Sequence, residues 1–187
     1  DEWGIDIILT GSQKALAMPP GLALFSVSER AFARAEQVEG RGYYFDLLEF
    51  RSNHAKGMTP STPVIPLIHA LNFTLNKIFK EGVENRHNRH DELNQLVHQW
   101  VARNGFELLP KKEFSSKSLT CVRNNLDLDV AGFVKALREE KKISIDGGYG
   151  KIKGKTFRIS NMGDETIETI NFLLSKMDEI LPRFLPA

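Results

Sequence analysis

The sequence has 187 residues, 41% of them hydrophobic, and its 25 basic and 24 acidic side chains give a formal net charge of +1. This composition fits one or two ordinary globular domains, and the balanced charge argues against nucleic acid or an anionic membrane as a partner. We expect neither a secretory leader nor a transmembrane segment, because no apolar run reaches the roughly 20 residues that cross a bilayer. The single cysteine, Cys121, cannot form an internal disulfide, which agrees with a reducing cytoplasm.

Two buried strands are predicted near the start of the chain, over the apolar runs 5–9 and 22–27. Between them, Lys14 follows a Gly-Ser pair directly. The exit of this turn is Pro19-Pro20-Gly21, where proline fixes φ and glycine allows positive φ. The sequence therefore predicts a lysine on a rigid turn at the end of a strand.

The segment that follows is predicted to be helical, then aromatic, then irregular. Ser28 opens a helical stretch that extends to residue 39. The aromatic run 43–48 predicts a short packed element. Residues 51–61 are polar and contain Gly57 and Pro60, which indicates a loop.

Two long helices are predicted in the middle of the chain. Thr62 suits an N-cap and Pro63 the first helical position. The apolar face of this first helix is Ile65, Ile68, Leu71, Leu75, Ile78 and Phe79. Gly82 is predicted to bend the chain, and the second helix ends at Asn104-Gly105. We place a domain boundary here, between residues 1–81 and 82–187.

The remaining sequence predicts a small α+β unit. The predicted strands are residues 106–109, 118–123, 141–145 and 155–160. Asp129 and Asp164 are predicted to cap the two helices. A glycine-rich turn, residues 146–150, precedes the last strand.

Two side chains could carry chemistry by position alone. Lys14 at the edge of apolar packing would lose hydration, which lowers the pKa of its amine and makes it a nucleophile; the alternative is an ordinary surface lysine. Arg158 lies in the middle of a strand, and its planar fork can hold a carboxylate through two hydrogen bonds. The alternative for Arg158 is an exposed side chain on a half-buried strand.

Other polar groups have simpler explanations. A helix beginning at Thr62 could bind a phosphate, although an N-cap explains this threonine equally well. His87 and His90 have helical spacing, but nothing nearby completes a zinc site, so we expect a solvated polar face and no metal. Cys121 lies in an apolar strand, where a thiol is usually inert.

Two motifs resemble the class V aminotransferases, fold-type I pyridoxal-phosphate enzymes that include the alanine–glyoxylate and serine–pyruvate aminotransferases. The first runs from Trp3-Gly4-Ile5-Asp6 through Gly11-Ser12-Gln13-Lys14-Ala15-Leu16 to Pro19-Pro20-Gly21 and resembles their Schiff-base segment. The second, Gly154-Lys155-Thr156-Phe157-Arg158-Ile159 followed by Met162-Gly163, resembles their small-domain segment.

The resemblance implies an α/β fold: the C-terminal part of a pyridoxal-phosphate-dependent transferase. Residues 1–81 would be the end of the large cofactor-binding domain, and residues 82–187 a small α+β domain with an antiparallel sheet. By resemblance, Lys14 is the Schiff-base lysine and Arg158 binds the substrate α-carboxylate. Gln13 lies on the phosphate side of pyridoxal 5'-phosphate, and Thr62 reaches the phosphate of the neighbouring subunit in a homodimer.

One departure from the family concerns the phosphate site. Relatives often have a tyrosine three residues before this threonine. The present chain has Thr59 at that position, which leaves a second phosphate contact open.

The implied activity is transamination between an amino acid and a 2-oxo acid such as glyoxylate or pyruvate. Roughly the first half of the enzyme would be absent, with its glycine-rich phosphate turn and the aspartate on the pyridine nitrogen, so we expect the chain alone to be inactive. Alternatives are a cysteine desulfurase or lyase, a non-catalytic dimerisation fragment, or another lysine–carbonyl chemistry. The desulfurases have a histidine before their lysine, where this chain has Gln13.

Overall fold

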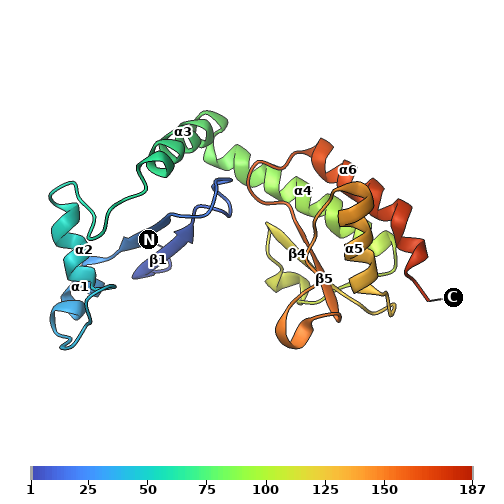
Figure 1. Cartoon of the computed structure of the whole chain (residues 1–187), viewed down its shortest axis with the longest axis horizontal. Helices are drawn as coiled ribbons and strands as arrows, with labels where there is room; N and C mark the ends of the chain where they lie inside the picture. Colours follow the sequence, from blue (N-terminus) through green and yellow to red (C-terminus); the bar gives the residue numbers. More distant parts are fainter. Residues whose placement is uncertain (1, 187) are drawn as a thin grey trace. The chain divides into compact units, whose positions relative to one another are not determined.

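The computed structural model describes residues 2–186 of a mixed α/β chain that divides by its contacts into two compact units, Asp1–Lys77 and Ile78–Ala187. The division falls inside α3, four residues before the boundary placed from sequence. The elements of the first unit, including the helix that crosses the division, are β1 (Ile7–Gly11), β2 (Ala23–Val27), α1 (Glu29–Glu36), α2 (Leu47–His54) and α3 (Ile65–Glu81) (Figure 1). The second unit contains α4 (Val83–Arg103), β3 (Glu107–Leu108), β4 (Leu119–Arg123), α5 (Val130–Lys141), β5 (Thr156–Ser160) and α6 (Ile167–Ile180).

The first unit is built on an antiparallel pair of strands. In the β1–β2 ladder, Ile7 pairs with Val27 and Gly11 with Ala23, so both predicted strands exist. The prediction that they are buried is wrong for the described residues: Leu9, for example, is 68% exposed. Two strands without a covering layer cannot remove their side chains from water.

Capping side chains start the short helices of the first unit. The Ser28 hydroxyl accepts a hydrogen bond from the Ala31 N–H (3.1 Å), which confirms the predicted start of α1. Asp46 caps α2 in the same way through the Leu48 N–H (3.0 Å), so the loop predicted from residue 51 is in fact helical as far as His54. The segment 43–45 was predicted to pack but is strongly exposed.

Two glycines delimit the long helix α4. Gly82 has φ +88° and separates α3 from α4, as predicted. The helix ends at Asn104, and Gly105 follows with φ +76°. Positive φ is easily reached only by glycine, so these two positions determine the ends of the helix.

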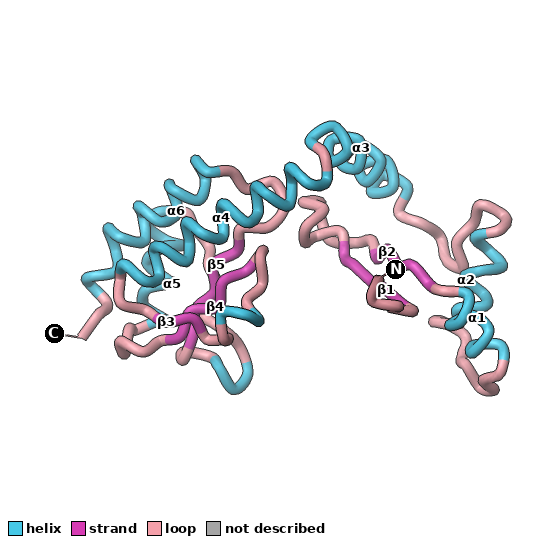
Figure 2. The backbone as a smooth tube through the Cα atoms, turned by 180° about the vertical axis from the view of Figure 1, so that it is seen from behind, coloured by secondary structure: helices cyan, strands magenta, loops and turns pink. Residues whose placement is uncertain are grey.

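The second unit contains a three-stranded antiparallel sheet, in the order β3-β4-β5, and helix α4 packs against β3 and β4 (Figure 2). Phe157 of β5 has no exposed surface, and its ring contacts Trp100 of α4 and Phe133 of α5. Helix α6 packs against both α4 and α5. The core of the chain lies here, and its largest fully buried apolar side chains are Trp100, Phe133, Phe157, Leu93, Leu137, Ile159, Ile170, Met177 and Ile180.

Two predictions of secondary structure in this unit are wrong. Residues 142–145 form no strand, because Lys142 ends α5 in the left-handed conformation and the segment reaches β5 only through the single bridge Asp146–Arg158. The N-cap of α6 is Thr166 rather than Asp164. Asp164 instead forms an ion pair with Arg86 of α4 (3.4 Å), a long-range contact that local sequence does not reveal.

None of the helices within residues 2–186 combines the length and the apolar composition that a membrane span requires.

Candidate functional site

Lys14 lies on a closed turn at the end of β1. The turn is held by Ser12, which has no exposed surface. The Ser12 hydroxyl donates to the Pro19 carbonyl oxygen (2.7 Å) and accepts from the Leu22 N–H (3.2 Å). The backbone of Ser12 also bonds to both sides of the turn, to Leu22 and Met18. One buried side chain therefore joins the entry and the exit of the segment that presents Lys14.

The side chain of Lys14 is exposed in this chain. The prediction that apolar packing removes its water is therefore wrong for the described residues, since the small β1–β2 sheet offers no wall against which a lysine could pack. Within residues 2–186, Lys14 has neither a hydrogen bond from its amine nor an ion pair. The amine is thus sterically open to a carbonyl compound.

Gln13 folds back over the end of β1. A Cβ atom placed on Gly11 would stand 2.6 Å from the Gln13 side-chain oxygen. A side chain at position 11 would therefore clash with the Gln13 amide in this position. Gln13 is itself exposed. Its amide N–H groups can donate to an anion held beside the turn.

The helix start predicted at Thr62 is wrong, because α3 begins at Ile65. Thr62 is an exposed residue of the preceding segment. The first N–H groups of the helix are already used, by bonds from Ile65 to the Pro63 carbonyl oxygen (3.0 Å) and from Leu67 and Ile68 to Val64. Pro66, the second residue of α3, has no N–H. A phosphate here would therefore be bound by the Thr62 hydroxyl rather than by the end of the helix.

The exit of the lysine turn packs against α3. Gly21 has φ +141°, and a Cβ at this position would stand 2.5 Å from a methyl carbon of Leu67. A larger residue at 21 would displace either the turn or the helix. Lys14, Gln13 and Thr62 all belong to the first unit, whereas Arg158 belongs to the second.

Arg158 projects from β5 on the face opposite Phe157 and Ile159, as the alternation of the strand predicts. Its Nε donates to Asp146 Oδ1 (3.0 Å), and its Nη2 lies 2.9 Å from the same oxygen. The Tyr149 ring centroid is 4.4 Å from the guanidinium carbon. The guanidinium holds the pKa of the Asp146 carboxyl below its usual range, and that carboxylate in turn raises the pKa of Arg158.

Sequence reasoning missed Asp146 and Tyr149 because they belong to a turn whose pairing with β5 is not local. The only available signal was an acidic residue directly before two glycines, ahead of a strand with a central arginine. Such a pattern does not reveal which side chains will meet.

Cys121 pairs across the strands with Arg158. Burial raises the pKa of this thiol, so the protonated, weakly nucleophilic form is favoured. This agrees with the prediction of an inert cysteine.

The segment 86–90 is only in part the solvated polar face predicted from sequence: His87 is exposed, whereas Arg86 and His90 are buried. The His90 ring is buried and is hydrogen-bonded at both nitrogens, because Nδ1 lies 2.7 Å from the Arg86 carbonyl oxygen and the Gly163 N–H donates to Nε2 (3.2 Å). Asn161, fully buried just after β5, donates to the carbonyl oxygens of His90 and Lys117 (3.0 Å each). These bonds connect α4 to the segment that follows Arg158. No group of potential metal ligands occurs in the described part of the chain.

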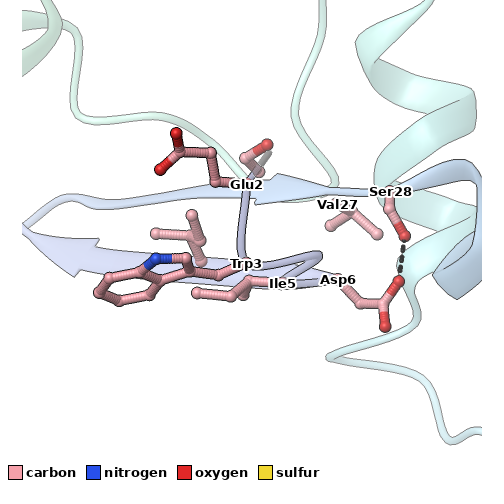
Figure 3. Close-up of a pocket in the computed structure, with 8 residues that line it drawn as sticks. Glu2, Trp3, Ile5, Asp6, Val27 and Ser28 are labelled. Carbon is pink, nitrogen blue, oxygen red and sulfur yellow. Dashed lines mark hydrogen bonds between the residues drawn. The ribbon is translucent and has the colours of Figure 1, made fainter.

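An open groove of about 520 Å³ lies at the opposite end of the β1–β2 hairpin from Lys14 (Figure 3). Trp3, 85% exposed, lies along it, and Asp6 at its edge accepts a hydrogen bond from Ser28 (2.6 Å). Bonds from Arg30 and Ser28 lower the pKa of Asp6 to about 2. Because no sequence-predicted site residue lines the groove, we do not assign it to the Lys14 site.

Comparison with known proteins identifies the family. The profile described as Aminotransferase class-V matches residues 1–167. The chain belongs to the class V aminotransferase family. A serine–glyoxylate aminotransferase from Methylorubrum extorquens is 34% identical to it over 170 residues, and an L-aspartate–glyoxylate aminotransferase from Paracoccus denitrificans is 34% identical over 167 residues. These alignments cover 88% and 89% of this class V chain and 42% of each relative.

A solved structure supports the same assignment. The alanine–glyoxylate aminotransferase from Nostoc sp. aligns with a TM-score of 0.89 and 27% identity, over 97% of this chain and 49% of that one. The present class V chain thus spans about half the length of the relatives it matches. Membership of this family implies pyridoxal phosphate as the cofactor. The open amine of Lys14 and the Gln13 amide beside Gly11 are compatible with that group.

Proposed function

We propose that this chain is the C-terminal half of a pyridoxal-phosphate-dependent aminotransferase that moves an amino group between an amino acid and a 2-oxo acid such as glyoxylate or pyruvate. The observation that carries the proposal is the Lys14 turn: an accessible amine, without a partner among the described residues, on a segment closed by a buried serine. A flexible surface lysine needs no such closure. The family assignment supports the same chemistry.

Three residues of the first unit would hold the cofactor. Lys14 would carry it covalently through its amine and Gln13 would donate a hydrogen bond to its phosphate, while Thr62 would donate one to the phosphate of the cofactor in the neighbouring subunit. When bound, the cofactor ring supplies an electron sink for the pair left at the substrate Cα after deprotonation. Gln13 and Thr62 are uncharged, so they would position the phosphate without neutralising it.

The remaining steps belong to this chain's own side chains. Lys14 Nζ would accept the proton from the substrate Cα and then release it, acting first as base and then as acid. Arg158 holds the substrate α-carboxylate through two parallel hydrogen bonds. Fixing the carboxylate fixes the direction of the Cα–H bond, and such positioning contributes strongly to rate.

We also propose that the first unit contacts another polypeptide segment through its exposed apolar side chains. Ile8 is 57% exposed, Leu9 68% and Phe73 71%. Together with Tyr43 and Phe45 they give this unit more exposed apolar surface than a stable isolated unit usually shows. We assign it to contact with the N-terminal half of the enzyme, and to a homodimer in which Thr62 serves the neighbouring subunit. The cytoplasm is the proposed location, in keeping with a single cysteine.

A desulfurase is the runner-up. A desulfurase needs either a reactive cysteine of its own or a thiol from another molecule. The raised pKa of Cys121 argues against a reactive cysteine in this chain. A dimerisation fragment without catalysis is the third reading, and it also predicts that the chain alone is inactive. The assay must therefore use both the 187-residue chain and the chain joined to an N-terminal half.

The test measures products. With pyridoxal phosphate, serine or alanine, and glyoxylate, the joined protein should form a 2-oxo acid from the donor, while the 187-residue chain alone should show negligible turnover. Lys14→Ala should abolish activity, and Lys56→Ala, an exposed lysine of the same unit, should not. Sulfide released from cysteine without oxo acid would favour the desulfurase. Turnover by the 187 residues alone would contradict the proposed division of the site.

A further inference from the structure

Asp146 holds one edge of the Arg158 guanidinium. A single carboxylate oxygen, Oδ1, accepts from Nε (3.0 Å) and lies 2.9 Å from Nη2. A guanidinium has five N–H donors in a plane, and Nε with the adjacent Nη hydrogen forms one of its edges. The other edge, formed by Nη1 and the outer hydrogen of Nη2, has no second carboxylate beside it within residues 2–186, and the other side chain that interacts with the guanidinium is Tyr149.

Tyr149 covers one face of the same guanidinium. Its ring centroid is 4.4 Å from the central carbon, which is within the distance of a cation–π contact. The side chain of Arg158 is only 20% exposed, compared with 48% for Asp146. With one edge bonded and one face covered, Arg158 has little freedom to rotate about its terminal torsions.

Asp146 is itself fixed by the backbone. Its Oδ1 also accepts from the Gly148 N–H (2.6 Å), and the Arg158 N–H donates to the Asp146 carbonyl oxygen (2.7 Å). Gly148 has φ +76°, and a Cβ there would stand 2.5 Å from Thr156 Oγ1. The glycine-rich turn is therefore shaped so that the carboxylate lies beside the arginine of β5.

We infer that Asp146 is a positioning residue for Arg158: it bonds the inner guanidinium edge so that the outer edge, beside the Tyr149 ring, receives the substrate carboxylate in one orientation. This inference rests on the proposed function of Arg158. It adds that Asp146 remains in place when the substrate binds. The alternative is that the substrate carboxylate displaces Asp146 and takes over its bonds.

Charge and geometry at Asp146 can be separated. Asp146→Asn keeps an acceptor oxygen where Oδ1 lies and removes the charge, whereas Asp146→Ala removes both. In the joined enzyme, we expect Asp146→Ala to lower kcat about tenfold or more, because a misplaced carboxylate misdirects the Cα–H bond. Asp146→Asn should keep kcat within about threefold, and its KM for 2-oxo acids should stay equal or fall because a competing negative charge is lost.

The matched control is Glu140, whose two oxygens lie 2.7 and 2.8 Å from Arg183 in the same unit. Glu140→Ala and Glu140→Gln break an equivalent exposed pair and should leave kcat and KM unchanged. Equal kcat for the wild-type enzyme and Asp146→Ala would overturn the inference. Arg158→Ala separately tests the proposed function. An unchanged KM for carboxylates in that variant would contradict the proposed role of Arg158, whatever the Asp146 variants show.

A spectroscopic readout needs no variant to fold. The ¹H–¹⁵N signal of Arg158 Nε reports the bond to Asp146, and the probe is pyruvate added to the joined wild-type enzyme. We expect the Nη signals to shift at saturation while the Nε signal stays in place. A comparable shift of Nε, toward its position in free arginine, would mean that pyruvate displaces Asp146 and would overturn the inference.

Discussion

Replacing Ser12 with alanine tests whether the Lys14 turn depends on one buried hydroxyl. The change removes the donor to the Pro19 carbonyl oxygen (2.7 Å) and the acceptor for the Leu22 N–H (3.2 Å). A buried polar group that loses its partner costs about 1–3 kcal/mol. Pro19 is exposed and Leu22 is half-buried, so water can reach both groups in part. We therefore expect the local stability of the turn to fall by about 1–2 kcal/mol, in the lower part of that range.

Amide hydrogen exchange measures this loss at the site. The Leu22 amide should exchange about 5–30-fold faster in Ser12→Ala, which is the factor that corresponds to 1–2 kcal/mol. Amides of the second unit, such as that of Phe157, should not change. Ser26→Ala is the control, because Ser26 is exposed on β2 and its hydroxyl makes no hydrogen bond within the described residues. Unchanged exchange at Leu22 in Ser12→Ala, or the same acceleration in Ser26→Ala, would refute this reasoning.

Three further changes test the second unit. The bonds from Arg89 and Arg86 lower the pKa of Glu81 to about 2, so its contribution is complete above its ordinary value of 4.5 and is lost as the pH falls from there toward 2. Glu81→Gln should therefore flatten the acid unfolding curve in that window, by about 1–2 kcal/mol after solvent screening, when followed by circular dichroism. Gly148→Ala should destabilise by about 1–3 kcal/mol more than Gly150→Ala in urea unfolding, because both glycines have positive φ but only Gly148 meets nearby atoms. Asn161→Ala removes the buried amide that donates to the carbonyl oxygens of His90 and Lys117, and should cost about 1–3 kcal/mol in the same assay.

The elements that the sequence predicted well are those with local causes. Ser28 and Asp129 cap helices because a short polar side chain can reach N–H groups two or three residues ahead. Gly82 and Gly105 end helices because of their own backbone freedom. Such signals need no knowledge of the rest of the molecule.

The failures have long-range causes. Thr62 and Asp164 are plausible caps locally, but α3 starts later, and Asp164 bonds to Arg86, 78 residues away. The burial of β1 depends on what covers the sheet, and apolar composition alone cannot supply that layer. The pairing of Asp146 with Arg158 needs a register between a turn and a strand, which no periodicity encodes.

The resemblance contributed what composition could not. It assigned roles to Lys14, Gln13, Thr62 and Arg158, and the family match supports the class of chemistry. The structure adds the local devices around them: the Ser12 closure of the lysine turn and the Asp146 bond to the arginine. These devices were invisible in the motifs, since they join residues whose contact depends on the folded backbone.

The central claim is that Lys14 carries the cofactor, and chemical trapping tests it most directly. The joined protein is loaded with pyridoxal phosphate, reduced with sodium borohydride to fix the cofactor to its lysine, digested, and mapped by mass spectrometry. We predict that the modification lies on the peptide containing Lys14 and disappears in Lys14→Ala. Stoichiometric labelling of a different lysine in the wild-type protein, or undiminished labelling in Lys14→Ala, would contradict the account.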